Sequence, residues 1–114
     1  MEKIVKQALY YDFYGELLTE HQKQIYEDVV LNDYSLSEIA QDRGISRQGV
    51  HDLIKRCNKI LEEYEAKLKL VEKFLHTKKV AKQINQLLEE YKGSREEHLL
   101  DQIQGLVAEI QKDL

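Results

Sequence analysis

Hydrophobic side chains recur at intervals of three and four residues along almost the whole chain, a spacing typical of amphipathic helices. Near the N-terminus this pattern predicts a helix over about residues 2–14. Gly15 is expected to end this helix by adopting the left-handed conformation. Thr19-Glu20-His21-Gln22 matches a capping box, in which the threonine hydroxyl and the glutamine side chain satisfy the first free amides of a helix. We therefore expect a second helix that starts after Thr19 and ends near Asn32.

Two further helix starts lie close together in the middle of the chain. Ser35-Leu36-Ser37-Glu38 is a second capping box, and Gly44 ends the short helix that it starts, because glycine adopts a left-handed turn without strain. Ser46 is placed to cap the helix that follows. These signals predict a helix-turn-helix at about residues 35–59. The small core between its two helices is expected to consist of Ile39, Ile45, Val50 and Leu53.

A heptad-like seam continues from the second of these helices and predicts one unbroken helix to residue 75. Its apolar positions are Val50, Ile54, Cys57, Leu61, Tyr64, Leu68, Val71 and Leu75. After Thr77 a new stripe of Val80, Ile84, Leu87 and Tyr91 runs to Gly93. Ser94-Arg95-Glu96-Glu97 resembles a third capping box. The last stripe consists of Leu100, Ile103, Val107, Ile110 and Leu114.

The predicted fold is therefore all-α and has no winged element. We expect a helix-turn-helix domain at residues 1–75, which includes the long recognition and connecting helix. A C-terminal helical hairpin at residues 76–114 would serve packing or dimerisation.

The composition supports a helical protein of the cytoplasm. The chain has no proline, five glycines and a single cysteine, Cys57, so no internal disulfide can form. No apolar run approaches the roughly 18 residues that span a bilayer, and the N-terminus lacks the apolar core of a signal peptide. We therefore expect no membrane insertion.

Charge is distributed unevenly, and this changes how the net charge of −4 is interpreted. An acidic protein is a poor match for nucleic acid, since neutralising phosphates supplies most of the affinity. Residues 46–61, however, carry four basic side chains and one acidic side chain, while the segments on either side are net acidic. A local basic footprint on the second helix of a helix-turn-helix is compatible with binding to double-stranded DNA.

In a helix-turn-helix the N-terminal residues of the second helix enter the major groove. Arginine can pair with guanine, and glutamine with adenine, through two hydrogen bonds. The side chains predicted to contact bases are Arg47, Gln48, His51 and Lys55. Those predicted to contact phosphates are Ser35, Ser46, Arg56 and Lys59. The alternative is that these groups are an ordinary solvated helix face. Gly49 either permits a close approach of DNA or has no special role.

The remaining residues that could react or bind a ligand are better explained by packing than by catalysis. Cys57 lies on the apolar seam and is expected to be buried, with redox sensing as the alternative. The four histidines are too scattered for a metal site. Tyr10, Tyr11, Phe13 and Tyr14 are expected to pack between helices, with stacking on bases as the alternative. No phosphate-binding loop or nucleophile motif is present, so we expect neither a cofactor nor enzyme activity.

Three segments carry a resemblance to a known family. Residues 18–22, 34–40 and 44–50 resemble the promoter-binding fourth region of bacterial sigma factors. With Asp12-Phe13-Tyr14 before them and residues 63–68 after them, the chain resembles more specifically the YlxM family. The resemblance is close over about residues 4–75. It implies a helix-turn-helix that binds DNA, and a link to the signal recognition particle pathway, because the family's genes tend to lie beside those of that particle's GTPases. The other sigma-factor regions are lacking, so promoter initiation is not implied.

Two questions stay open at this level. The basic face could dock on acidic protein or RNA of the signal recognition particle instead of on DNA. The 26-residue seam is about 39 Å long at 1.5 Å per residue, too long for two short helices to cover. The hairpin could cover it within one chain or across a two-fold axis. We expect a homodimer, because dimerisation doubles a small basic footprint.

Overall fold

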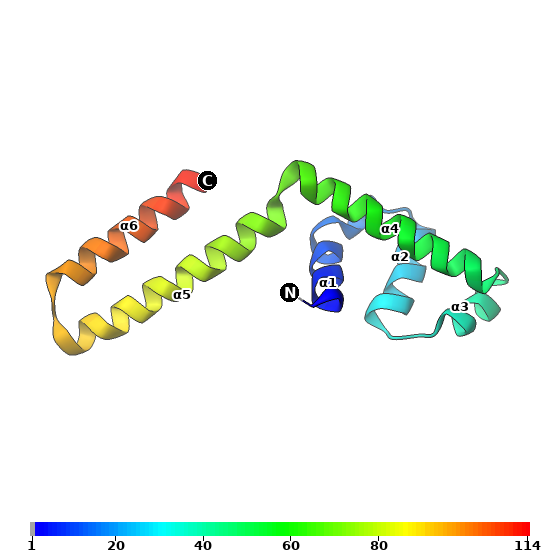
Figure 1. Cartoon of the computed structure of the whole chain (residues 1–114), viewed down its shortest axis with the longest axis horizontal. Helices are drawn as coiled ribbons and strands as arrows, with labels where there is room; N and C mark the ends of the chain where they lie inside the picture. Colours follow the sequence, from blue (N-terminus) through cyan, green and yellow to red (C-terminus); the bar gives the residue numbers. More distant parts are fainter. Residues whose placement is uncertain (1) are drawn as a thin grey trace. The chain divides into compact units, whose positions relative to one another are not determined.

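The computed structural model describes residues 2–114, and every regular element in that range is helical (Figure 1). The predicted all-α fold without a wing is therefore confirmed for the described residues. The chain divides into two compact units, Met1–Val71 and Glu72–Leu114.

The first unit holds the helix-turn-helix. Its elements are α1 (Lys3–Tyr14), the 3₁₀ turn η1 (Gly15–Leu17), α2 (Glu20–Tyr26), the π-helical segment η2 (Glu27–Leu31), α3 (Leu36–Arg43) and α4 (Arg47–Leu68). The predicted capping box at the start of α2 is present in full. The Thr19 hydroxyl accepts from the Gln22 amide at 3.2 Å, and the Gln22 side chain accepts from the Thr19 amide at 3.0 Å.

Gly15 follows α1 as predicted, but for a different reason. Its backbone is right-handed, with φ of −58°, so the predicted left-handed stop is wrong. A Cβ at this position would lie 2.8 Å from the ring of Tyr11, well inside van der Waals contact. Glycine is required here because the Tyr11 ring lies against the backbone where the chain turns away from α1.

The turn between α3 and α4 has the predicted geometry. Ser35 and Ser46 cap the two helices, their hydroxyls accepting from the amides of Glu38 at 3.0 Å and Gly49 at 2.9 Å. Gly44 is left-handed, with φ of 66°. The predicted core is confirmed. It is a buried cluster of Ile25, Ile39 and Val50, against which Ile45, Leu53 and Ile54 are partly buried.

The long helix is shorter than predicted. α4 ends at Leu68, Lys69 takes the left-handed conformation with φ of 56°, and α5 (Leu70–Ser94) begins immediately afterwards. The expectation of one unbroken helix over residues 47–75 is therefore wrong. Lysine pays a conformational cost in this region of backbone space, so other contacts must stabilise the break.

Tyr14, more than 50 residues earlier in the chain, supplies those contacts together with Glu65. The Tyr14 hydroxyl donates to the Glu65 carboxylate at 2.5 Å and accepts from the Leu70 amide at 3.2 Å. The same carboxylate accepts from the Val71 amide at 3.0 Å. Two amides of the first turn of α5 are thus capped from outside the helix. Burial and the neighbouring Glu65 raise the pKa of Tyr14, so its phenol remains a proton donor.

The second unit is the predicted hairpin of α5 and α6 (Glu97–Asp113). Val80 and Leu99 are its buried residues, and His76 pairs with Glu109 across the two helices at 2.8 Å. The turn differs from the prediction, because Ser94 is still helical, Arg95 has φ of 59° and Glu96 occupies the cap position.

The inward stripe of α6 also differs from the prediction. Its members are buried or half-buried: Leu99, Ile103, Leu106 and Ile110. Leu100, Val107 and Leu114, which were expected on this stripe, are 39%, 40% and 95% exposed. α6 therefore carries an inward and an outward apolar stripe. The stripe predicted from the sequence mixed residues of the two.

Gly44→Val should lower the free energy of unfolding of the first unit by about 1–3 kcal/mol. No atom lies within 4 Å of the added Cβ, so the cost is backbone strain alone. Gly93→Ala is the matched control, since that glycine is helical and also faces open space. Alanine there should stabilise the hairpin by about 0.5–1 kcal/mol. Urea unfolding followed by circular dichroism measures both, and equal effects would contradict the left-handed role of Gly44.

Tyr14→Phe should cost about 1–3 kcal/mol of stability, because it removes the buried hydroxyl that joins the Leu70 amide to the Glu65 carboxylate. Tyr34→Phe serves as the control, since Tyr34 is 49% exposed. Amide hydrogen exchange at Leu70 should accelerate in Tyr14→Phe and stay unchanged in the control. Unchanged exchange at Leu70 in both variants would mean that the break does not depend on Tyr14.

Candidate nucleic-acid interface

The position of α4 determines which of its side chains reach solvent. Val50, Cys57 and Leu61 are at most 1% exposed, and α1, α2 and α3 all contact this helix. A helix that buries one stripe must present the opposite one. The four predicted base-contacting residues all lie on exposed positions of α4.

Arg47, Gln48 and His51 lie together and line a shallow groove with Leu36 of α3. Lys55 lies one turn beyond His51, and both line a neighbouring groove with Lys3 and Gln7 of α1. The structure thus brings the predicted base readers into one continuous stretch. It is flanked by α3 at its N-terminal end and by α1 further along.

Asp52 restrains two of these side chains. Its carboxylate accepts from the Gln48 side-chain amide at 2.9 Å and lies 3.7 Å from Nδ1 of His51. The acceptor oxygen of Gln48 remains available for a base edge, and protonated His51 would gain a nearby counter-charge. Asp52 thereby orients the Gln48 and His51 side chains. Its own negative charge weakens the attraction of this surface for a phosphate.

The two serines expected at phosphates act first as helix caps. Each hydroxyl accepts from a backbone amide of its own helix, which leaves its proton free to donate to an anion. Gly49 gains a structural role from this arrangement. A Cβ at Gly49 would lie 3.0 Å from Oγ of Ser46, so a larger residue would require the capping hydroxyl to shift by a few tenths of an ångström.

Arg56 and Lys59 are exposed and line a third groove together with Lys55, Lys3, Asn58 and Glu62. Lys3 is a candidate interface residue that sequence reasoning missed. Lys3 is the first residue of α1 and is more than 40 residues before α4 in the sequence. Its charge joins this surface only because α1 packs on α4. Glu62 pairs with Lys6 of α1 at 3.9 Å, so one of the carboxylates at this edge is partly neutralised.

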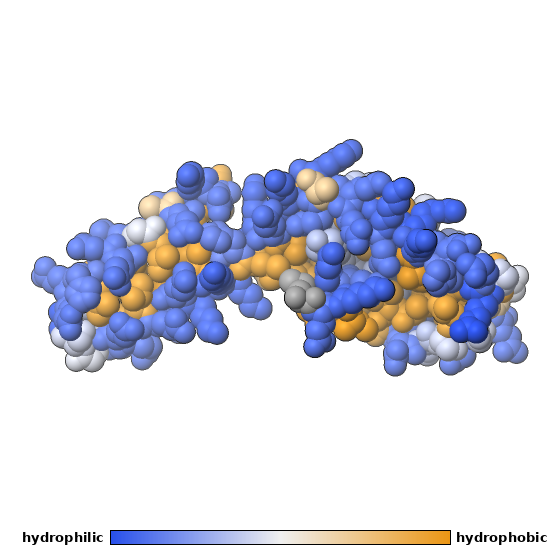
Figure 2. Space-filling view, in the orientation of Figure 1, coloured by the Kyte–Doolittle hydropathy of each residue, from blue (hydrophilic) through white to orange (hydrophobic). Residues whose placement is uncertain are grey.

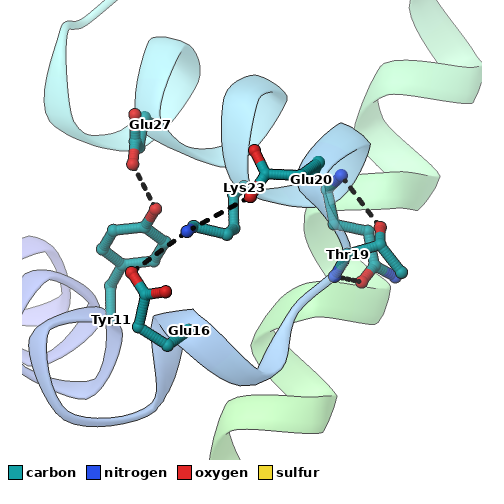
Figure 3. A network of polar contacts seen from close by, with 7 residues as sticks. Tyr11, Glu16, Thr19, Glu20, Lys23 and Glu27 are labelled. Carbon is teal, nitrogen blue, oxygen red and sulfur yellow. Dashed lines mark hydrogen bonds and ion pairs between the residues drawn. The ribbon is translucent and has the colours of Figure 1, made fainter.

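Two aromatic residues of α1, Tyr11 and Tyr14, pack between helices as expected, whereas Phe13 is 36% exposed. Tyr14 is 1% exposed, and the Tyr11 ring stacks on Tyr26 with 5.4 Å between centroids. Figure 3 shows the polar surroundings, in which Tyr11 donates to Glu27, and Lys23 pairs with Glu16 at 3.0 Å and with Glu20 at 3.6 Å. Tyr14 cannot stack on bases without unfolding the unit, and the carboxylates beside Tyr11 would repel a phosphate backbone.

Cys57 and the histidines complete the set of candidate residues. The Cys57 thiol is fully buried, as expected for a core residue, and burial raises its pKa to about 11 against a small lowering effect of Arg56. Within residues 2–114 no three potential metal ligands lie close together. None of the described helices is long and apolar enough to cross a membrane.

The first unit thus has the features of a helix-turn-helix protein. Two capped helices are joined at a left-handed glycine, a small buried core lies between them, and the outer face of the second helix is basic. Residues 1–111 match the family model described as "Putative helix-turn-helix protein, YlxM / p13 like", so the chain belongs to the UPF0122 family. This confirms the family resemblance read from the sequence.

Curated relatives carry the same family name. The UPF0122 protein of Acetivibrio thermocellus is 51% identical over 84 residues, which covers 74% of this chain and 72% of that protein. The UPF0122 protein of Bacillus mycoides is 39% identical over 112 residues, covering 98% of this chain and 97% of its own length. A Bacillus cereus relative is 38% identical with the same coverage.

The burial of Cys57 predicts slow thiol chemistry. Raising the pKa from 9.0 to about 11 lowers the thiolate fraction near neutral pH about a hundredfold, and burial slows access further. Alkylation at pH 8 should therefore be at least a hundredfold slower in the folded protein than in urea. Comparable rates, measured by mass spectrometry with free cysteine as a standard, would point to an accessible redox-active thiol.

Proposed function

We propose that this chain is a DNA-binding regulatory protein that reads double-stranded DNA with the N-terminal half of α4, and that its activity is binding and not catalysis. The observation that carries the proposal is the coincidence of two features. The helix-turn-helix places the start of α4 on the surface, and the same stretch holds the basic segment of residues 46–61. Either feature alone would be compatible with a scaffold.

In the proposed complex the N-terminal half of α4 enters the major groove. Arg47 pairs with a guanine, and the free oxygen of Gln48 accepts from an adenine or cytosine amino group. Arg56, Lys59 and Lys3 contact phosphates, as do the amides at the N-termini of α3 and α4 that begin after Ser35 and Ser46.

A homodimer is part of this proposal. One copy offers five basic side chains on this surface, Lys3 included, next to Asp52 and Glu62. Phosphate contacts each add to affinity through counterion release, so one copy binds weakly at physiological salt. Two copies double the contacts and can read two half-sites.

A second candidate function is supported by the same carboxylates. Asp52 and Glu62 reduce the positive electrostatic potential of this surface. A moderately basic surface with shallow grooves suits an acidic protein or RNA partner. We propose the components of the signal recognition particle as such a partner, since the family resemblance implies a link to that pathway. DNA is the better match, because α4 has the length and exposed side chains that a major groove accepts.

Arg47→Ala should cost about 1–3 kcal/mol of affinity for a selected duplex and relax its sequence preference, since Arg47 reads a base. Lys59→Ala should weaken all sequences alike and reduce the slope of log affinity against log salt by about one phosphate contact. Lys67→Ala, which removes an exposed cation in the last turn of α4 and outside residues 46–61, is the matched control and should change neither quantity. Fluorescence anisotropy over a range of salt concentrations measures all three.

The same titration distinguishes the two candidate functions. An RNA duplex of the same sequence should bind more weakly than DNA, because the narrow major groove of A-form RNA excludes a helix. Equal binding to both duplexes, or no effect of Arg47→Ala on either, would contradict DNA reading by α4 and favour the second candidate.

A further inference from the structure

The α5–α6 hairpin has two faces of different character. The polar face carries residues that each come one position before an inward apolar residue. They line an open groove between the helices: Gln83, Gln86, Glu90, Gln102 and Gly105. The other face carries residues that each follow an inward residue. These are Ala81, Leu88, Leu100 and Val107, after Val80, Leu87, Leu99 and Leu106.

The second set forms two regular apolar rows. Leu100 and Val107 of α6 and the C-terminal Leu114 that follows it are spaced by seven residues, and on α5 Phe74, Ala81 and Leu88 have the same spacing. The five large members are between 39% and 95% exposed. In a helix each step of one residue turns about 100°, and antiparallel helices turn in opposite senses when viewed from one end. Both rows therefore lie on the same face of the hairpin.

The two rows are also level with each other. The His76–Glu109 pair at 2.8 Å fixes the antiparallel register of the hairpin. In that register Ala81 lies near the height of Val107, and Leu88 near that of Leu100. Figure 2 shows apolar side chains (orange) between α5 and α6 in the hairpin, where the inward stripes of the two helices meet. A heptad-spaced apolar surface of this kind is what a helix presents to further helices.

The rows are compatible with a two-fold axis. If the face is turned over and reversed about its middle, Val107 and Ala81 each meet their own symmetry mates, and each end residue meets the opposite end of the same row. Apolar positions then face apolar positions along the whole surface, as an isologous interface requires.

Charge selects the antiparallel arrangement. Residues 73–82 carry four lysines and no carboxylate, while residues 89–101, around the turn, carry five carboxylates and two basic groups. Reversal places the lysine-rich end of one copy against the acidic turn of the other, at both ends of the interface. A parallel arrangement would place the lysine-rich ends together.

The available area is small for a dimer interface. The overlapping part of α5, about 18 residues, is about 27 Å long, and two helices side by side are about 20 Å wide. This gives roughly 1,100 Å² for the two copies together, near the lower bound of specific protein interfaces. The measurement therefore has to reach concentrations of tens to hundreds of micromolar.

We propose that this face docks a second copy of the chain as an antiparallel four-helix bundle, with Val107 at the two-fold axis. The inference rests on the homodimer included in the proposed function and names its surface. It also assigns a role to the outer stripe of α6, which the hairpin itself does not need for its core.

Val107→Glu should convert the dimer to a monomer. Light scattering after size exclusion at 100 μM should give twice 13.5 kDa for the unmodified chain and 13.5 kDa for Val107→Glu. Gln102→Glu adds the same charge to the polar face and should remain dimeric. Circular dichroism should show unchanged helicity in both variants, because neither side chain is in the hairpin core. A monomeric unmodified chain, or equal loss of the dimer in both variants, would overturn the proposal.

Disulfide trapping tests the antiparallel geometry. Val107→Cys should cross-link to the partner's Val107→Cys under mild oxidation. Leu100→Cys should not, because its symmetry mate lies 14 residues away along the helix, about 21 Å. Cross-linking of both variants would indicate a parallel pair and contradict the proposed arrangement. The buried native Cys57 keeps the background low.

The outcomes separate this inference from the proposed function. If the surface is wrong and DNA reading is right, Val107→Glu leaves the oligomeric state and the duplex affinity unchanged, and Arg47→Ala still weakens binding. If DNA reading is wrong and the surface is right, the dimer forms and Val107→Glu dissolves it, while Arg47→Ala changes no duplex affinity.

Discussion

The packing of three helices on one stripe of α4 is the constraint on which the first unit depends. Val50, Cys57 and Leu61 are buried almost completely, and they hold α1, α2 and α3 around a single helix. The same burial leaves the opposite side of α4 in solvent with its arginine, lysine and glutamine side chains. Core and candidate interface are thus two sides of one helix, and the left-handed Gly44 sets the angle at which that helix is presented.

Features that depend on local rules could be predicted from the sequence. Capping serines, the glycine turn and the spacing of the wedge core each involve residues within one or two turns of one another. The exposure of Arg47, Gln48, His51 and Lys55 follows from the same periodicity. The surroundings of these residues could not be predicted, because Lys3 reaches the surface only through the packing of α1 on α4.

The predictions that were wrong failed because each depended on contacts that local sequence patterns do not contain. The break at Lys69 depends on the Tyr14 hydroxyl from a distant helix, and apolar residues on both sides of the break continue the heptad pattern without interruption. Gly15 is explained by a neighbouring ring and not by its own backbone angle. The stripe of α6 was misassigned because Leu99 and Leu100, and again Leu106 and Val107, are adjacent apolar pairs. Periodicity cannot tell which member of such a pair faces inward.

A nuclear magnetic resonance titration can show whether α4 is the surface that contacts DNA. Uniformly ¹⁵N-labelled protein would be titrated with a short duplex at low salt, where sequence-independent binding is strong. We expect amide shifts concentrated at the starts of α3 and α4 and along residues 46–59, with smaller shifts near Lys3. Shifts confined to α5 and α6, or the absence of any shift at a millimolar excess of duplex, would contradict this expectation.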